Sequence, residues 1–71
     1  MKNINENNNR GIITIHDVVE TYANYMLCVT GSHEISILWN DGGDVYYIVG
    51  QFSGESCKDD AMAMWYGIIE G

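Results

Sequence analysis

Apolar and polar residues alternate most clearly in the middle of the chain. Over residues 34–40 (EISILWN) every second side chain is large and apolar, which predicts a half-buried strand. The next run, residues 45–49 (VYYIV), is apolar without alternation. Between them, NDGGD holds the Asp-Gly and Gly-Gly pairs that tight hairpin turns favour, because such turns need positive φ angles. We therefore predict a β-hairpin over residues 34–40 and 44–51.

The segment before the hairpin predicts a helix over residues 15–29. Thr14 and Asp17 fit the T-x-x-D pattern of a capping box, and Gly31 is a typical stop signal. The apolar residues between these signals recur at helical spacing: Ile15, Val18, Val19, Tyr22, Met26 and Val29.

The segment after the hairpin predicts a second helix over residues 57–69. Ser56 and Asp59 form another S-x-x-D pattern, and the DDAMAMWYGII run lacks proline and is rich in helix formers. Acidic residues cluster at its start, where the helix dipole stabilises negative charge.

The order helix, strand, strand, helix predicts an α+β fold. We expect a small single domain in which a two-stranded antiparallel hairpin is packed by two helices (α-β-β-α), and which a dimer would extend to four strands. The opening segment is Asn-rich and nearly devoid of apolar residues. We expect a flexible tail over residues 1–11 and one domain over residues 12–71.

A hairpin of this composition carries more apolar surface than one packed face needs. If Gly42 and Gly43 are central, Trp39 faces Tyr46, Ile37 faces Ile48, and the opposite face remains uncovered. That second face is a candidate oligomer interface, consisting of Leu38, Val45, Tyr47 and Val49. The alternative is that a small core wraps around all of these side chains.

The net charge of −7, from 10 acidic and 3 basic residues, bears on the partners of the chain. Binding a phosphate backbone requires clustered Lys and Arg, so direct binding of nucleic acid or of an anionic membrane is disfavoured. An acidic surface instead attracts a basic protein groove that normally holds DNA or RNA, as a nucleic-acid mimic does. Acidity that serves only solubility is the alternative, and the sequence leaves both open.

We assign partner binding to acidic and aromatic side chains of the hairpin and the second helix. Carboxylates supply the charge, and aromatic residues supply the anchors that are enriched in interface cores. The residues of this candidate surface are Asp41, Asp44, Tyr47, Glu55, Asp59, Asp60, Trp65 and Tyr66.

Catalytic and metal-binding patterns are weak, so we expect no enzyme, no metal and no cofactor. Cys57 at a helix start is the best nucleophile candidate, but the neighbouring carboxylates raise rather than lower a thiol pKa. The two cysteines and two histidines match no zinc-site spacing. An EF-hand loop starting at Asn40 or Asp41 would lack the Glu required at its twelfth position.

By size, acidity and charge-poor apolar surface, the chain resembles the small inhibitors that viruses and mobile elements make against host nucleic-acid enzymes. The resemblance is one of composition and implies an anti-restriction or anti-CRISPR type of inhibitor, or a modulator, that docks on a basic groove. The alternative is a non-catalytic assembly subunit that forms a homo-oligomer through its apolar hairpin face. No membrane-spanning run or signal-peptide pattern is present, so we expect a cytoplasmic protein.

Overall fold

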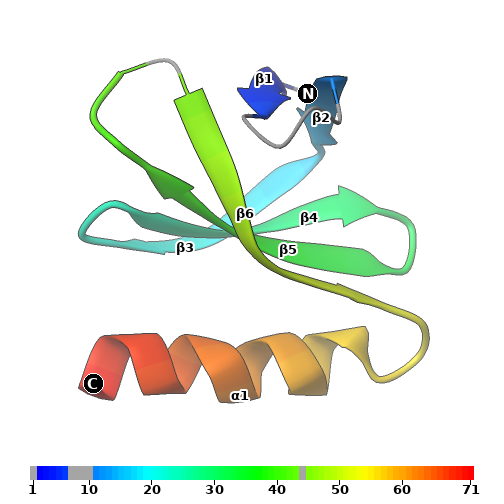
Figure 1. The fold of residues 1–71 in the computed structure, drawn as a ribbon. Coiled ribbons are helices and arrows are strands. Elements are labelled where there is room, and N and C mark those ends of the chain that lie inside the picture. Colours follow the sequence, from blue (N-terminus) through cyan, green and yellow to red (C-terminus); the bar gives the residue numbers. More distant parts are fainter. Residues whose placement is uncertain (1, 7–10, 44) are drawn as a thin grey trace.

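The computed structural model describes residues 2–6, 11–43 and 45–71, with side chains from residue 14 onward. Its strands and helix follow one another along the chain as shown in Figure 1. They are β1 (Lys2–Glu6), β2 (Gly11–Ile15), β3 (Asp17–Tyr22), β4 (Tyr25–Gly31), β5 (Glu34–Asn40), β6 (Val45–Ser53) and α1 (Cys57–Glu70).

Strands β3 to β6 form a four-stranded antiparallel sheet, and α1 follows it. The full sheet has the order β2-β1-β6-β5-β4-β3, because β1 joins β6 in parallel and β2 joins β1 in antiparallel. β2 and β3 therefore lie at opposite edges, although only His16 separates them in sequence. The sheet must curl to bring these edges together, and the amide of His16 donates a 2.8 Å hydrogen bond to the carbonyl of Val29.

The α-β-β-α prediction is wrong: the described residues contain one helix, and residues 15–29 form strand rather than helix. This segment is rich in β-branched and aromatic residues, which favour strands. Its YMLCV run is buried on both sides, with Leu27 facing α1 and Cys28 facing the opposite side of the sheet. A continuous apolar run of this kind suits a central strand, and tertiary packing here overrides the helical spacing.

Helix α1 confirms the second predicted helix, because it runs from Cys57 to Glu70 against the predicted 57–69. It lies along one face of the sheet (Figure 1), where Ala61 and Trp65 pack on Leu27 and Ile37. The predicted capping bond does not form. Ser56 is the N-cap without a side-chain cap bond, and its hydroxyl instead lies 3.2 Å from Oδ2 of Asp60.

The opposite face of the sheet holds a second apolar cluster, which is covered by Ile15 where the chain passes from β2 to β3. Ile15, at the end of β2, packs on Cys28 and Leu38, and partly buried side chains surround them. Burial raises the pKa of the Cys28 thiol from 9.0 to about 11, since the thiolate would lose its hydration. The sheet is therefore packed on both faces, whereas the predicted hairpin was packed on one face only.

The predicted hairpin is present as β5 and β6, but its predicted register is wrong. Trp39 pairs with Tyr47 rather than Tyr46, and the two rings lie 5.6 Å apart. Val49 is an extra residue in β6, since Leu38 pairs with Ile48 whereas Ile37 pairs with Gly50. The longer loop shifts the pairs between the turn and the bulge by one position, so Tyr46 and Ile48 change face. The bulge adds a second position, so beyond Val49 the residues of β6 return to the predicted face.

Part of the predicted flexible tail, Lys2–Glu6, is strand β1. Residues 1 and 7–10 lie outside the described residues, so the flexibility assigned to them stays a prediction.

Candidate functional site

Strand β3 forms an edge of the sheet, and all six of its residues are exposed. Among the described residues, β4 is the only strand that pairs with it. Val18, Val19 and Tyr22 are 45%, 50% and 45% exposed, which is high for large apolar side chains. Asp17 and Glu20 lie between them in sequence. The edge therefore combines unpaired backbone groups, apolar side chains and carboxylates.

A β-bulge explains why consecutive valines are both exposed. Val18 pairs with Cys28 and Glu20 pairs with Leu27, so Val19 has no partner on β4. A bulge of this type bends an edge strand and redirects its side chains. It places Val18 and Val19 on the surface, where neither packs into the core.

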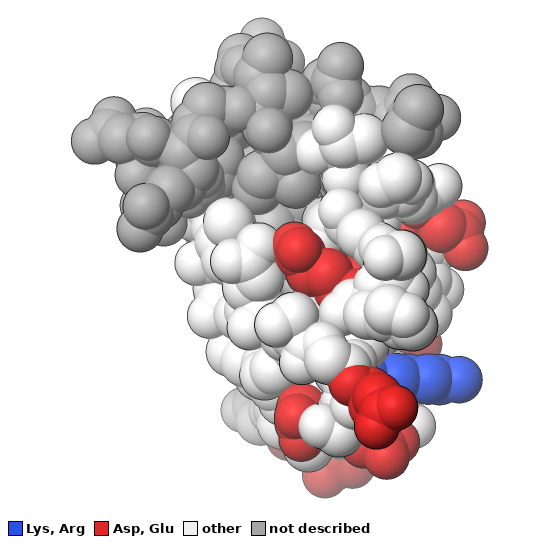
Figure 2. Space-filling view, turned by 90° about the vertical axis from the view of Figure 1, so that its right-hand side faces the viewer, with Lys and Arg blue, Asp and Glu red and all other residues white. Residues whose placement is uncertain are grey.

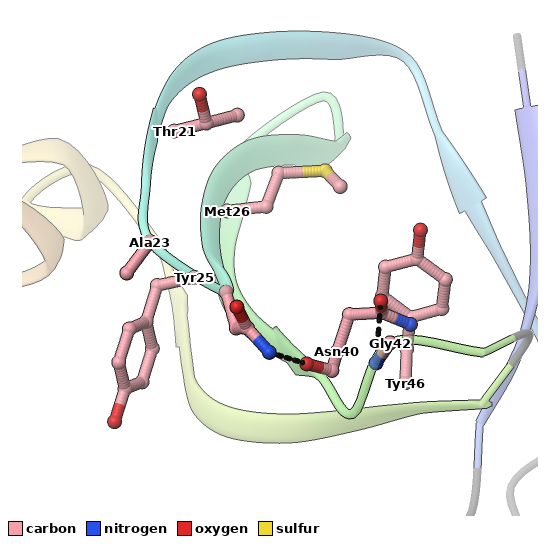
Figure 3. A pocket seen from close by; sticks show the side chains of 8 residues that line it. Thr21, Ala23, Tyr25, Met26, Asn40, Gly42 and Tyr46 are labelled. Carbon is pink, nitrogen blue, oxygen red and sulfur yellow. Dashed lines mark hydrogen bonds between the residues drawn. The ribbon is translucent and has the colours of Figure 1, made fainter.

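A pocket of about 230 Å³ lies at the end of the same strand, between the β3–β4 turn and the β5–β6 loop. Figure 3 shows Thr21 and Met26 extending toward it, whereas the ring of Tyr25 points away. Its lining has no charged side chain and consists of Thr21, Ala23, Asn24, Tyr25, Met26, Asn40, Gly42 and Tyr46.

Two asparagines fix the position of the turns that border this pocket. Nδ2 of Asn24 donates a 2.7 Å hydrogen bond to the carbonyl of Asn40, whose own amide donates a 2.9 Å bond to the carbonyl of Asn24. Nδ2 of Asn40 also donates to the carbonyls of Gly43 and Val45, each at 2.9 Å. The pocket is therefore preformed by bonds within the chain.

Residues 40–43 of the loop between β5 and β6 are hydrogen-bonded to one another and form a turn. The amide of Gly42 donates to Oδ1 of Asn40, and the amide of Gly43 donates to Oδ1 of Asp41, both at 3.0 Å. Gly42 has a φ of +103°, as the turn reading requires. Within residues 2–6, 11–43 and 45–71, no group of three or more metal-ligating side chains is present.

Ala23 is the residue of the β3–β4 turn with strained backbone geometry. Its φ of +53° is the positive value that residues other than glycine rarely adopt. Strain of this kind persists only where the surroundings hold it, here by the bonds between Asn24 and Asn40.

The residues predicted to bind a partner do not form one surface. Trp65 is fully buried, Tyr47 is half-buried, and Tyr66 is 53% exposed on α1. Asp41 is exposed in the β5–β6 loop, and Asp44 lies outside the described residues. The other carboxylates, Glu55, Asp59 and Asp60, are exposed at the start of α1, at the other end of the sheet.

The predicted oligomer interface is also distributed differently from expectation. Leu38 is fully buried beneath Ile15, and Val45 and Tyr47 are half-buried. Val49 is 39% exposed at the bulge of β6. These side chains do not share one open face, and whether any of them contacts a second copy stays a prediction.

Sequence reasoning missed the edge strand, because it placed Val18, Val19 and Tyr22 on the packed face of a helix. The signal that could have found it is the density of β-branched residues from residue 18 to residue 21, followed by a short polar break at Asn24.

One carboxylate takes part in a hydrogen-bonded network. Oε2 of Glu34 accepts bonds of 2.8 Å from Thr30 Oγ1 and from Gln51 Nε2. Oγ1 of Thr30 also lies 2.9 Å from the buried hydroxyl of Ser36. This network joins β4, β5 and β6 at the end of the sheet away from the pocket, and its serine is inaccessible to a substrate.

The remaining described carboxylates form no ion pair with a described side chain. Asp17, Glu20, Asp41, Glu55, Asp59, Asp60 and Glu70 are all exposed, and no ion pair forms among the described side chains. Of the three Lys and Arg residues, Lys58 alone lies in the part of the chain whose side chains are described. In Figure 2 several acidic side chains gather around the lower part of the molecule, beside a basic side chain, and others lie higher on the same face.

Comparison with protein-family models, with curated proteins and with solved structures finds no match. Within the described residues, α1 is the helix to consider for membrane insertion, and it is too short and too polar to cross a bilayer.

Proposed function

We propose that the chain is a small acidic protein-binding module that docks on a basic surface of a nucleic-acid-handling protein and inhibits or modulates it. The observation that carries the proposal is the set of exposed carboxylates without cationic partners. Their charge is not neutralised within the described part of the molecule, so it is available to a partner.

The distribution of the charge supports docking rather than catalysis. The carboxylates lie along the β3 edge, in the β5–β6 loop and at the start of α1. Such spacing favours long-range steering toward a basic groove, since each charge contributes to one field. Both described cysteines are buried, and Cys28 holds its proton at neutral pH because its pKa is about 11.

The test is to neutralise the carboxylates that lie far from β3. A variant with Asp41→Asn, Glu55→Gln, Asp59→Asn and Asp60→Asn keeps the side-chain shapes and removes four charges. Proteins captured by the wild type from a host lysate are purified, and their binding to the chain is measured against salt, with a short DNA duplex as competitor.

We expect the neutralised variant to bind about tenfold more weakly at 0.1 M salt, with a flatter dependence on salt, and the duplex to compete. Equal affinity of variant and wild type, or no competition by DNA, would overturn the proposed function. A change in the stability of the variant is checked by thermal unfolding.

A further inference from the structure

The chemistry of the β3 edge differs from that of the rest of the surface. An edge strand presents backbone N–H and C=O groups that lack partners, and these groups can pair with another extended chain. On β3 they come together with exposed Val18, Val19 and Tyr22. We propose that this edge accepts an extended basic segment of the partner protein as an added strand; the inference rests on the function proposed above.

The pocket at the end of β3 can provide the sequence specificity that strand addition alone lacks. Main-chain bonds give affinity to an added strand, whereas pockets for its side chains give specificity. Thr21 in β3 and Ala23, which directly follows β3, both line the pocket (Figure 3), so a chain that extends along β3 comes close to it. A volume of about 230 Å³ accommodates one long side chain.

Charge complementarity selects a basic segment. Asp17 and Glu20 lie along the edge and have no ion-pair partner among the described side chains. In the pocket, the Tyr46 ring and the Met26 thioether suit the stem and the cationic head of an arginine or lysine, which binds favourably over an aromatic face.

The same charges disfavour a second copy of this chain as the occupant. Pairing two β3 edges would bring their carboxylates together, and each molecule carries a net charge of −7. Like charges across a strand pair are destabilising.

The strand has 6 residues, so the contact is small. Interfaces well below about 1,200 Å² belong to weak or transient complexes, and we expect a dissociation constant on the order of micromolar for the isolated segment.

The test uses two synthetic octapeptides of alternating Arg and Val with blocked ends. In the second peptide all backbone amides are N-methylated, so it has the same charge but cannot donate strand hydrogen bonds. Binding is measured by calorimetry for the wild type, for Val19→Thr/Tyr22→Ser, and for the matched control Val49→Thr/Tyr66→Ser, which alters an exposed valine and an exposed tyrosine away from β3.

We expect the first peptide to bind the wild type and the control equally, and the β3 variant at least about fivefold more weakly. The N-methylated peptide should bind the wild type about tenfold or more weakly than the first peptide. Equal binding of both peptides would overturn strand addition while leaving charge-driven docking, and so the proposed function, intact. A dimer in sedimentation that dissociates in the β3 variant would identify a second copy as the occupant and overturn the inference.

Discussion

Asn24 and Asn40 bind each other twice, once from the side-chain amide of Asn24 at 2.7 Å and once from the backbone amide of Asn40 at 2.9 Å. The residues are 16 positions apart, so these bonds join two separate hairpin turns. They fix the wall of the pocket and the end of the edge strand. The two turns that border the surface we propose for binding are therefore joined to each other.

Asn24→Ala should lower the free energy of unfolding by about 1 to 2 kcal/mol, because it removes the side-chain bond to Asn40. Urea unfolding followed by circular dichroism measures this. Thr21→Ala is the control, since Thr21 lines the same pocket but has no hydrogen bond from its side chain. An equal loss in both variants would contradict the role given to Asn24.

Gly50→Ala should destabilise the fold by roughly 1 to 3 kcal/mol. A Cβ atom at Gly50 would lie 2.7 Å from the sulfur of Met64 and 3.0 Å from the ring of Phe52, so these two side chains would have to move from their packed positions. Gly67→Ala is the matched control in the helix, where nothing lies within 4 Å of the added atom. It should stabilise by up to about 1 kcal/mol through helix propensity. Thermal unfolding should show a lower melting temperature for Gly50→Ala and a higher one for Gly67→Ala.

Ala23→Gly should stabilise the protein by up to about 1 kcal/mol, because glycine adopts the φ of +53° without the clash that Ala23 suffers. Ala63→Gly, at an exposed position of α1, should instead destabilise by about 1 kcal/mol. Chemical denaturation compares the two. Destabilisation by Ala23→Gly would show that this turn carries no strain.

Stability should fall at alkaline pH through Cys28. The thiol has a pKa of about 11 in the folded protein and 9.0 without burial, so the unfolded chain loses its proton first. The stabilisation is present in full below pH 9 and is lost as the pH rises through 11, and it amounts to roughly 2 to 3 kcal/mol. Cys28→Ala should flatten this part of a stability–pH curve measured by urea unfolding. A curve with unchanged slope would contradict the assignment.

The parts of the fold that sequence predicts are those with a strong local signal. Helix α1 follows from its start signal and helix formers, and the hairpin of β5 and β6 follows from its glycine pair. The register of that hairpin depends on the length of the loop after Asn40 and on the bulge at Val49, and the sequence shows no local pattern that predicts either.

The prediction of a helix in the first half of the chain was wrong for a different reason. The spacing of Ile15, Val18 and Tyr22 fits a helix as well as it fits strands, and short apolar segments do not distinguish the two. The decision is made by contacts far apart in sequence, such as Ile15 on Leu38. Since the candidate edge lies in this segment, the site could not be located before the fold.

Hydrogen exchange of the β3 amides tests the central claim most directly. With the Arg-Val octapeptide at ten times its dissociation constant, amides of β3 should exchange about tenfold more slowly, because the bound form protects them. The N-methylated peptide should leave them unchanged. Protection at the start of α1 instead of β3, or equal protection by both peptides, would contradict strand addition at this edge.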